Sequence, residues 1–361
     1  MKKILVAMSG GVDSSVAARL LCEAGYTCIG CTMRLYDNED AGGSTGKACC
    51  SLDDVEDARS VAHRLGMPYY VFNFTEDFRK TVMERFTQAY LCGQTPNPCI
   101  DCNRYMKFDR LYARALLLGC DGIATGHYAR IRQKNGIYQL CKAKDPSKDQ
   151  SYVLYHLTQE QLAHTLFPLG DYCKSDTRRM AEAGGFLNAD KPDSQDICFV
   201  PDGDYVAFIT RFTGQEPAPG DFVDQTGKRV GTHRGIIHYT VGQHRHLGLV
   251  ADGKRYVCAI RPAENAVVVG EEKALYSRRV AVSDVNWISG QVPAGAIACK
   301  VKIRYRQPEQ PATVTPRADG SADILFEQPQ RAVTPGQSAV FYDGDQVLGG
   351  GTILAPVADG E

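Results

Sequence analysis

Seven residues near the start of the chain combine glycines with hydroxyl side chains in a pattern suited to holding phosphate. Residues 9–15 read SGGVDSS, directly after a predicted strand and directly before a predicted helix. The glycines let the backbone approach a phosphate closely, and the helix start adds unpaired N–H groups with a partial positive charge of about half a unit. The segment has no Walker lysine and no G-x-G-x-x-G pattern. A phosphate-binding loop is favoured over the alternative, a serine-capped turn.

Two further segments carry cysteines. Residues 95–103 read TPNPCIDCN, and their prolines predict an irregular loop that puts Cys102 at the start of a helix over 103–118, where the helix dipole lowers a thiol pKa from about 8.5. A reactive thiol, a metal knuckle and an inert pair are all consistent with C-x-x-C. Residues 193–199 read DSQDICF, and Cys198 taken alone is typical of a buried core cysteine.

The elements around these segments alternate between strand and helix patterns. We predict strands at 4–8, 27–33, 69–74 and 123–125. A helix is predicted over 55–65, with Asp53 and Glu56 as a capping pair and Gly66 as its stop. Another is predicted over 176–183, capped by Ser175 and ended by Gly184 and Gly185. This order predicts a doubly wound parallel sheet. Met33 and Gly126-His127 would then line its crevice, although a core methionine and a turn at 125–127 are equally consistent.

From about Gly214 the chain changes to short alternating runs, which predict β-structure, with hairpin turns at Asp319-Gly320 and Asp343-Gly344. We expect three domains: a catalytic domain at 1–205, a small connecting domain at 206–275 and a β-barrel at 276–361. Within the barrel, basic residues alternate with apolar ones over 300–306 (KVKIRYR). One strand there would present a basic stripe to a phosphate backbone, or only a solvated sheet face.

Composition limits the function classes. The 361 residues include 43% hydrophobic and 23% charged residues, as in ordinary globular proteins, and 41 Lys and Arg balance 42 Asp and Glu. Any affinity for RNA must therefore come from local patches. No apolar run reaches membrane-spanning length, and residues 1–8 do not resemble a signal peptide. We therefore expect a cytoplasmic protein without a membrane partner. Its 14 cysteines should be reduced thiols.

The 9–15 loop resembles that of the ATP-pyrophosphate lyases, which cleave ATP between its α and β phosphates. The resemblance implies the adenine nucleotide α-hydrolase-like fold, with ATP and Mg²⁺ as cofactors. It also implies ATP contacts from the following residues: Ala7, Met8, Ser9, Gly10, Gly11, Val12, Asp13, Ser14, Met33 and Gly126.

The three segments together resemble the tRNA-specific 2-thiouridylases of bacteria and organelles. Further matching stretches are KDQSY at 148–152, RYRQP at 304–308, VTPGQSAVFY at 333–342 and GGG at 349–351. The resemblance covers nearly the whole chain. It implies as substrate the wobble uridine of lysine, glutamate and glutamine tRNAs, with Cys198 as persulfide carrier and Cys102 as its catalytic partner. It also implies tRNA contacts from these residues: Asn97, Pro98, Cys99, His127, Lys148, Asp149, Gln150, Arg304, Tyr305, Arg306 and Gln337.

One position departs from the family pattern. Well-known members carry an aspartate where this chain has Cys99, which leaves the acid or base open, since Asp101 would point elsewhere in an extended loop. Cys99, Cys102 and Cys198 could instead hold a [4Fe-4S] cluster that carries sulfide. A zinc site using Cys49 and Cys50 is less favoured because adjacent cysteines are awkward tetrahedral ligands.

The expected reaction begins with adenylation of the uridine oxygen by ATP. A Cys198 persulfide, supplied by a sulfur-relay donor, then attacks the activated carbon. Cys102 frees the sulfur either by forming a disulfide with Cys198 or by assisting as an acid. The base must leave its stack to react. Two alternatives share the 9–15 loop: an adenylating amide ligase of a small metabolite, and a non-catalytic nucleotide-binding sensor. Neither needs two reactive cysteines.

Overall fold

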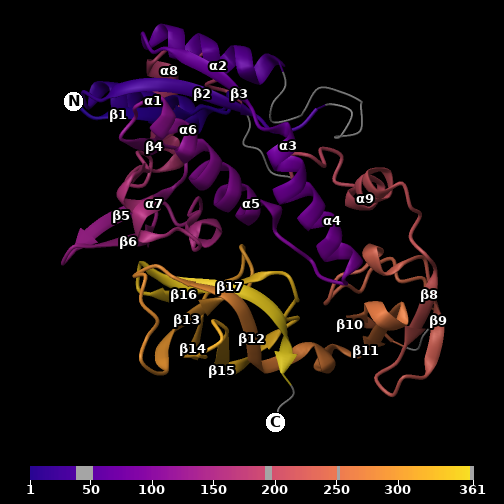
Figure 1. The fold of residues 1–361 in the computed structure, drawn as a ribbon. Coiled ribbons are helices and arrows are strands. Elements are labelled where there is room, and N and C mark those ends of the chain that lie inside the picture. Colours follow the sequence, from indigo (N-terminus) through magenta and orange to yellow (C-terminus); the bar gives the residue numbers. More distant parts are fainter. Residues whose placement is uncertain (38–51, 192–196, 250–252, 358–361) are drawn as a thin grey trace.

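The computed structural model describes residues 1–37, 52–191, 197–249 and 253–357, and Figure 1 shows its three parts. A helix-flanked sheet formed by the first half of the chain lies above a C-terminal barrel, and a smaller β-rich part lies beside both. Cys49, Cys50 and residues 193–196 lie outside the described residues. No helix in the described ranges is long and apolar enough to cross a membrane.

The first half is built on a five-stranded parallel sheet, which confirms the predicted fold class. Its strands run in the order β3-β2-β1-β4-β7. Their bounds are β1 Lys3–Ala7, β2 Thr27–Arg34, β3 Tyr69–Asn73, β4 Gly122–Ala124 and β7 Thr165–Leu166. Alternate residues of β1 enter different cores, because side chains in a strand point to opposite faces: Leu5 joins one cluster, Ile4 and Val6 the other.

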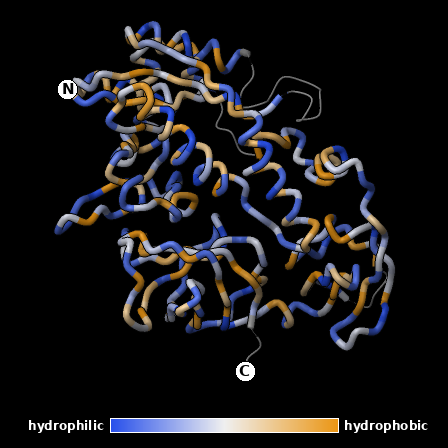
Figure 2. Tube along the Cα trace, in the orientation of Figure 1, coloured by the Kyte–Doolittle hydropathy of each residue, from blue (hydrophilic) through white to orange (hydrophobic). Residues whose placement is uncertain are grey.

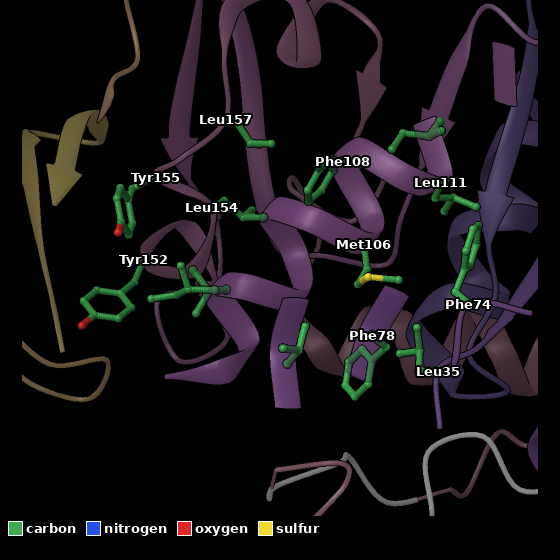
Figure 3. Close-up of a cluster of buried hydrophobic side chains, with 14 of the residues drawn as sticks. Leu35, Phe74, Phe78, Met106, Phe108, Leu111, Tyr152, Leu154, Tyr155 and Leu157 are labelled. Carbon is green, nitrogen blue, oxygen red and sulfur yellow. The ribbon is translucent and has the colours of Figure 1, made fainter. Parts of the chain in front are cut away.

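Helices cover both faces of this sheet (Figure 1). The cluster with Val6 is closed by α1 (Val12–Glu23), α2 (Leu52–Arg64) and α8 (Lys174–Ala183). The cluster with Leu5 contains residues of α3 (Thr75–Phe78), the π-helical η1 (Arg79–Met83), α4 (Glu84–Leu91) and α6 (Leu111–Leu117). Figure 3 shows part of it, including Phe78 and Met106. The remaining elements of this half are the hairpin β5 (Ala129–Lys134) and β6 (Ile137–Lys142), the 3-10 helix η3 (Ser151–Leu154) and α7 (Gln159–Ala163).

The helix predicted over 103–118 begins five residues earlier. Asn97 is its N-cap and accepts a hydrogen bond from the Cys99 N–H at 3.1 Å, and Pro98 occupies the first turn, where a missing N–H costs nothing. Helical backbone then runs without a break through α5 (Pro98–Asp101), the π-helical η2 (Cys102–Arg110) and α6. The expected irregular loop at Cys99 is therefore wrong, because the proline that suggested it starts the helix.

Two predicted caps also differ. The N-cap of α8 is Cys173 and not Ser175: the Asp176 carboxylate accepts a hydrogen bond from the Cys173 N–H at 3.1 Å. Helix α2 begins at Leu52, so Asp53 lies inside its first turn, where an acidic residue still favours the helix dipole. Gly66 does end α2 with a positive φ of 68°, as predicted.

The middle part consists of a helix and a small mixed sheet. Helix α9 (Tyr205–Thr213) leads into a sheet of order β10-β11-β8-β9. These strands span β8 Gly220–Val223, β9 Arg229–His233, β10 Tyr256–Arg261 and β11 Ala266–Gly270, and short 3-10 turns lie at Ile236–His238, Pro262–Glu264 and Glu272–Leu275. Phe222, Val257 and Val267 are fully buried at its centre.

The C-terminal part is a barrel, as predicted. Its strands follow one another as β12-β15-β14-β13-β16-β17, and a β12–β17 pairing closes the ring. They span β12 Tyr276–Trp287, β13 Ile297–Lys302, β14 Gln310–Pro316, β15 Ala322–Arg331, β16 Ser338–Asp343 and β17 Gln346–Val357. Hydrophilic and hydrophobic segments are mixed over the barrel (Figure 2); buried and more exposed residues alternate along β14, whereas β16 is buried over its first five residues. The predicted turns at Gly320 and Gly344 join β14 to β15 and β16 to β17.

The predicted basic strand over 300–306 is only partly present. Strand β13 ends at Lys302, and Arg304 and Tyr305 lie in the bend that follows. Arg304 is half-buried and donates to the Ala332 carbonyl at 2.7 Å and the Thr334 hydroxyl at 2.8 Å. A single basic stripe is therefore wrong, because Arg304 holds a neighbouring loop and does not extend the strand.

The barrel is tied to the first half through backbone pairing, packing and charge. Gln346 of β17 pairs with Cys141 of β6, so the β5–β6 hairpin adds to the barrel sheet. Val340 and Tyr342 of β16 belong to the same buried cluster as Leu5. Lys142 forms an ion pair with Glu309 at 2.7 Å. The barrel and the parallel sheet thus share one hydrophobic core.

Replacing Phe341 by alanine should lower the free energy of unfolding by about 3–5 kcal/mol, the usual cost of deleting a buried phenyl ring. Phe341 is fully buried and lies 5.5 Å from Trp287 between ring centroids. Trp287 is the single tryptophan of the chain, so its fluorescence during urea unfolding reports this change. The matched control is Leu325→Ala, whose side chain is exposed on the barrel surface and should change stability by less than about 0.5 kcal/mol.

Candidate functional site

The phosphate loop at residues 9–15 is fixed by its own hydroxyl groups. The Ser14 hydroxyl accepts a hydrogen bond from the Ser9 N–H at 3.1 Å and donates to the Gly11 carbonyl at 3.1 Å. The Ser15 hydroxyl donates to the same carbonyl at 2.9 Å. Gly11 is the N-cap of α1, and no described side chain caps that helix. The first N–H groups of α1 are therefore not taken up by a side-chain cap, as a phosphate-binding helix start requires.

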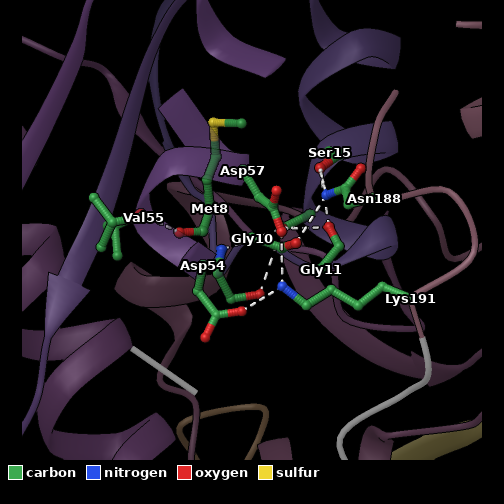
Figure 4. A network of polar contacts seen from close by, with 12 residues as sticks. Met8, Gly10, Gly11, Ser15, Asp54, Val55, Asp57, Asn188 and Lys191 are labelled. Carbon is green, nitrogen blue, oxygen red and sulfur yellow. Dashed lines mark hydrogen bonds and ion pairs between the residues drawn. The ribbon is translucent and has the colours of Figure 1, made fainter. Parts of the chain in front are cut away.

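A second glycine in the loop is required by close packing. Gly10 has a φ of +74°, and a Cβ at this position would lie 2.3 Å from the Asp54 carbonyl oxygen in the first turn of α2. Figure 4 shows Gly10 beside Asp54. Only glycine allows both the positive φ and this backbone contact. The loop is therefore packed closely against the first turn of α2.

Two residues far along the chain support the loop from the side shown in Figure 4. The Asn188 amide donates to the Gly10 carbonyl at 2.8 Å and to the Ser15 hydroxyl at 3.0 Å. Lys191 donates to Asp54 at 2.5 Å and to Asp57 at 2.8 Å. Burial opposes the charged ammonium, but the two carboxylates outweigh it and raise the pKa of Lys191. These contacts could not be predicted, because no sequence pattern relates 188–191 to residues 10–57.

The acidic residue of the loop is neutralised. Asp13 accepts hydrogen bonds from the Lys174 ammonium at 2.7 and 2.8 Å and from the Tyr128 hydroxyl at 2.8 Å. The Tyr128 hydroxyl also lies 3.0 Å from the Thr177 hydroxyl of α8. An ammonium beside Asp13 reduces the repulsion that this carboxylate would exert on phosphate. Lys174 was not among the predicted site residues.

The other predicted ATP-binding residues surround this loop. A Cβ on Gly126 would lie 2.8 Å from the Ser14 N–H nitrogen, so the segment after β4 touches the start of α1. Met8 is buried at the end of β1, where its carbonyl accepts a hydrogen bond from Thr32 at 2.6 Å. Met33, at the end of β2, is half-buried against the cluster that contains Leu5. Carboxyl ends of parallel strands therefore meet here, where open α/β sheets bind ligands.

The cysteines Cys102 and Cys198 pack against one hydrophobic cluster. Both are half-buried against the cluster that holds Phe78 and Phe86. Next to Cys198, the ring of Phe199 lies 5.3 Å from that of Phe86, and the Cys198 carbonyl accepts a hydrogen bond from Tyr36 at 2.5 Å.

Helix α4 contacts the neighbour of each cysteine. Arg85 donates to Asp101, the residue before Cys102, at 3.2 Å, while the adjacent Phe86 contacts Phe199, the residue after Cys198. The neighbours of two cysteines that are 96 positions apart in sequence (198 − 102) therefore contact the same helix.

The predicted location of Cys102 at a helix start is wrong. Cys102 follows the first helical turn and is the first residue of the π-helical η2, whereas Cys99, which is exposed, lies in the first turn. The favourable end of the helix dipole acts mainly on that first turn. Asp101 faces α4, and burial raises its pKa more than Arg85 and Arg104 lower it.

Two buried histidines, His127 and His156, lie near each other, and His127 contacts η2, the helical segment that begins at Cys102. His127 Nδ1 is 2.7 Å from the Thr125 hydroxyl, and its Nε2 is 3.5 Å from the Lys107 ammonium of η2. Burial, helped by Lys107 and His156, lowers the pKa of His127 well below its ordinary value. Burial also lowers the pKa of His156 to about 3, and within the described part of the chain neither of its ring nitrogens has a hydrogen-bond partner. Sequence reasoning missed His156, since a single buried histidine leaves no pattern.

Several predicted tRNA-binding residues meet where the barrel touches the first half. Gln150 accepts a hydrogen bond from the Tyr128 N–H at 2.9 Å, and the carbonyl of its neighbour Asp149 accepts one from the Tyr305 hydroxyl at 3.2 Å. Burial raises the pKa of Tyr305, and the nearby Asp149 and Cys99 add to this effect. Residues near the phosphate loop, the C-x-x-C segment and the barrel are thus brought together.

The remaining predicted tRNA-binding residues lie at separate places on the barrel and the first half. The Gln337 amide donates to the Thr95 carbonyl at 2.6 Å, which ties the barrel to the segment holding Asn97 and Pro98. Lys148 is half-buried in the turn before Gln150, and Arg306 is exposed after β13. Arg304, by contrast, is directed into the barrel loop described above.

The described residues offer no ready metal site. Among them, no three His, Cys, Asp or Glu side chains gather closely enough to hold an ion. Cys99, Cys102 and Cys198 therefore do not fit a [4Fe-4S] cluster in this structure. Mg²⁺ usually takes one or two carboxylates and the phosphates of its nucleotide, and Asp13 is the carboxylate of the loop itself.

Comparison with known proteins covers nearly the whole chain. Three family models match: one described as "tRNA methyl transferase HUP domain" at residues 2–202, one as "tRNA methyl transferase PRC-barrel domain" at 206–271 and one as "Aminomethyltransferase beta-barrel domain" at 277–353. Proteins named tRNA-specific 2-thiouridylase MnmA from Magnetococcus marinus and Acetivibrio thermocellus are 49% and 50% identical, each over 98% of this chain and 99% of theirs. A 4-thiouridine synthetase solved with RNA and ATP is similar at 17% identity and a TM-score of 0.36, over 59% of this chain and 50% of that one.

Replacing Gly10 by alanine should abolish ATP binding, because the added methyl group cannot fit beside the Asp54 carbonyl and the loop must move. Isothermal titration of ATP into the variant measures this loss. The matched control is Gly66→Ala. Gly66 has a similar φ of 68°, but nothing lies within 4 Å of its Cβ, so this variant should lose about 1–2 kcal/mol of stability and still bind ATP. Equal ATP affinity in the two variants would contradict the proposed packing constraint.

The stability of the protein should fall as pH decreases below about 6.5, the ordinary pKa of an unfolded histidine. The folded-state pKa of His156 is about 3, so between these values the unfolded state binds more protons and unfolding becomes easier. This one residue should contribute a slope of about 1.4 kcal/mol per pH unit. Urea unfolding at pH 7, 6 and 5 measures the slope, which His156→Phe should reduce; an unchanged slope would contradict the assignment.

Proposed function

This chain belongs to the tRNA-specific 2-thiouridylase family, and on that basis we propose that it replaces an oxygen of a tRNA uridine by sulfur at the expense of ATP. The substrate is the wobble uridine of lysine, glutamate and glutamine tRNAs. The observation that carries the proposal is the packing of Cys102 and Cys198 on one cluster beside α4, in the same domain as a phosphate loop with an uncapped helix start.

The first step activates the uridine oxygen. Oxygen leaves a carbonyl carbon poorly, so O2 of uridine attacks the α-phosphate of ATP, an O–P bond forms and pyrophosphate departs. The loop at 9–15 and the start of α1 stabilise the negative charge on the phosphates, and Lys174 keeps Asp13 from opposing it. Mg²⁺ bound to the nucleotide would neutralise further charge. The product is a base linked through O2 to AMP.

The second step delivers sulfur. The terminal sulfur of a Cys198 persulfide attacks C2 of the base, and AMP leaves with the oxygen. The base is then joined to Cys198 through an S–S bond. The Cys102 thiolate attacks the Cys198 sulfur, the S–S bond to the base breaks, and the base keeps its sulfur as a thiocarbonyl. The resulting Cys102–Cys198 disulfide is reset by a dithiol reductant, and a protein persulfide donor reloads Cys198.

Base recognition falls to the residues at the junction of the barrel and the first half. Tyr305, Gln150 and the Cys99 segment come from three separate stretches of chain, and unstacked bases are commonly held by aromatic rings and amide groups. Exposed Arg306 and half-buried Lys148 are suited to contact phosphate. Arg304 supports this junction through the loop at 332–334.

The two cysteines should fail at different points. With ATP, a persulfide donor and unmodified tRNA, the wild type should form AMP and 2-thiouridine in equal amounts. Cys198→Ala should still release pyrophosphate and form the adenylated base, but it should form neither AMP nor thiolated base, because AMP leaves only when the persulfide attacks. Cys102→Ala should accumulate a protein–tRNA adduct that dithiothreitol releases as 2-thiouridine, because the S–S bond to the base is made but not broken. Non-reducing gels and mass spectrometry of the nucleosides measure these outcomes.

Three controls sharpen this experiment. Cys92→Ala removes an exposed cysteine at the end of α4 and should be fully active. A tRNA with cytidine at the wobble position should give neither product. Cys99→Ala, purified without oxygen, should be colourless and active if sulfur travels through thiols; loss of both an iron–sulfur absorbance band and activity would favour the cluster route.

AMP formation that needs ammonia and not tRNA would point to an amide ligase, and ATP binding without turnover to a sensor.

A further inference from the structure

Strand β12 of the barrel contains a bulge whose extra residue reaches the helix that carries Cys102. Ser283 pairs with Thr352 and Asn286 with Gly350, so β12 has one more residue than β17 across this interval. Asp284, inside the bulge, has a φ of +50°, a left-handed conformation that non-glycine residues seldom adopt. The bulge directs the Asp284 side chain away from the barrel ladder.

The Asp284 carboxylate contacts Arg104. Its two oxygens accept hydrogen bonds from the two terminal guanidinium nitrogens, one of them at 3.2 Å. Arg104 is two residues after Cys102 in the same π-helical segment η2. A two-point contact between a planar guanidinium and a carboxylate fixes orientation as well as distance. Next to the bulge, the Asn286 amide donates to the Tyr155 carbonyl at 2.8 Å and so anchors β12 on the first half.

The barrel also holds the other end of this stretch. The Thr95 N–H donates to the Pro335 carbonyl at 2.9 Å, and the Thr95 carbonyl accepts the Gln337 amide at 2.6 Å. Residues 95–104, which include both Cys99 and Cys102, are therefore bound by the barrel at each end.

The Asp284 contact is poorly explained as a stabilising feature. The Arg104 and Asp284 side chains are 35% and 53% exposed, and ion pairs this accessible to water add little to folding stability. The left-handed backbone at Asp284 costs about 1–2 kcal/mol of folding free energy, which such an exposed ion pair barely offsets. A strained residue that is kept where a barrel meets a reactive thiol indicates a role in positioning.

We propose that Asp284 is a positioning residue that acts through Arg104 to set the orientation of Cys102 for release of the sulfur. The inference rests on the proposed function and assigns the barrel a second task beyond contacting tRNA. Docking of the barrel and orientation of the thiol are then one event. Adenylation, which uses the phosphate loop, does not depend on this contact.

Asp284→Asn tests the inference, because asparagine tolerates the left-handed backbone and removes only the charge. Arg104→Met and the double variant complete a double-mutant cycle. In the first turnover, AMP formation with tRNA should stay within about twofold of wild type, while release of 2-thiouridine from Cys198 should slow about 10-fold to 100-fold, the range for a misplaced reacting group. The double variant should be no worse than either single one, since both changes break the same contact.

A second readout does not require the proposed function. The rate at which iodoacetamide alkylates Cys102, assigned by tandem mass spectrometry, should change in Asp284→Asn without tRNA or ATP. The matched control is Asp323→Asn, which breaks an exposed pair with Arg317 elsewhere in the barrel and should change neither readout. Equal loss of AMP and thiolation in the first turnover, additive effects in the cycle, or an unchanged alkylation rate would each overturn the proposal. A wild type without AMP formation would instead refute the proposed function.

Discussion

The structure depends on one hydrophobic cluster that runs from the parallel sheet to the barrel. Leu5 of the central strand, Phe86 of α4 and Val340 of β16 are all buried in it. Cys102 and Cys198 lie against the same cluster, so the thiols are positioned by the core that joins the domains. Because protein interiors are packed as densely as organic crystals, movement of any one of these elements must be accommodated by the others. The proposed sulfur chemistry and the fold therefore share this constraint.

The phosphate loop could be predicted because its sequence and its backbone depend on the same residues. Gly10 needs a positive φ and lies against the Asp54 carbonyl, so no other residue type would serve there. The strands were equally predictable, since Leu5 and Val6 point to opposite faces and both are buried. Gly66 and Gly344 marked the ends of elements for the same reason, a left-handed backbone that glycine tolerates. Local sequence is informative wherever local geometry restricts the residue type.

The site residues that sequence reasoning missed depend on contacts between distant segments. Asn188 and Lys191 support residues more than 130 positions away, and nothing in residues 186–191 indicates this. The prolines near Cys99 predicted a loop because proline interrupts helices. Proline is also common in the first turn of a helix, and here Asn97 and Pro98 together start one. Arg304 looked like part of a strand because its neighbours alternate, but the strand ends at Lys302. Periodicity does not show where a strand stops.

The π-helical backbone that begins at Cys102 has a consequence for how this region tolerates change in length. A π-helix is wider than an α-helix because each hydrogen bond spans one more residue. Removing one residue from Cys102–Arg110 would let the segment tighten towards an α-helix, in which each residue turns the chain by about 100°. Arg104 and Cys102 would then face different neighbours even though every side chain was kept. Single-residue insertions and deletions between 102 and 110 should consequently be far rarer among active relatives than substitutions at the same positions.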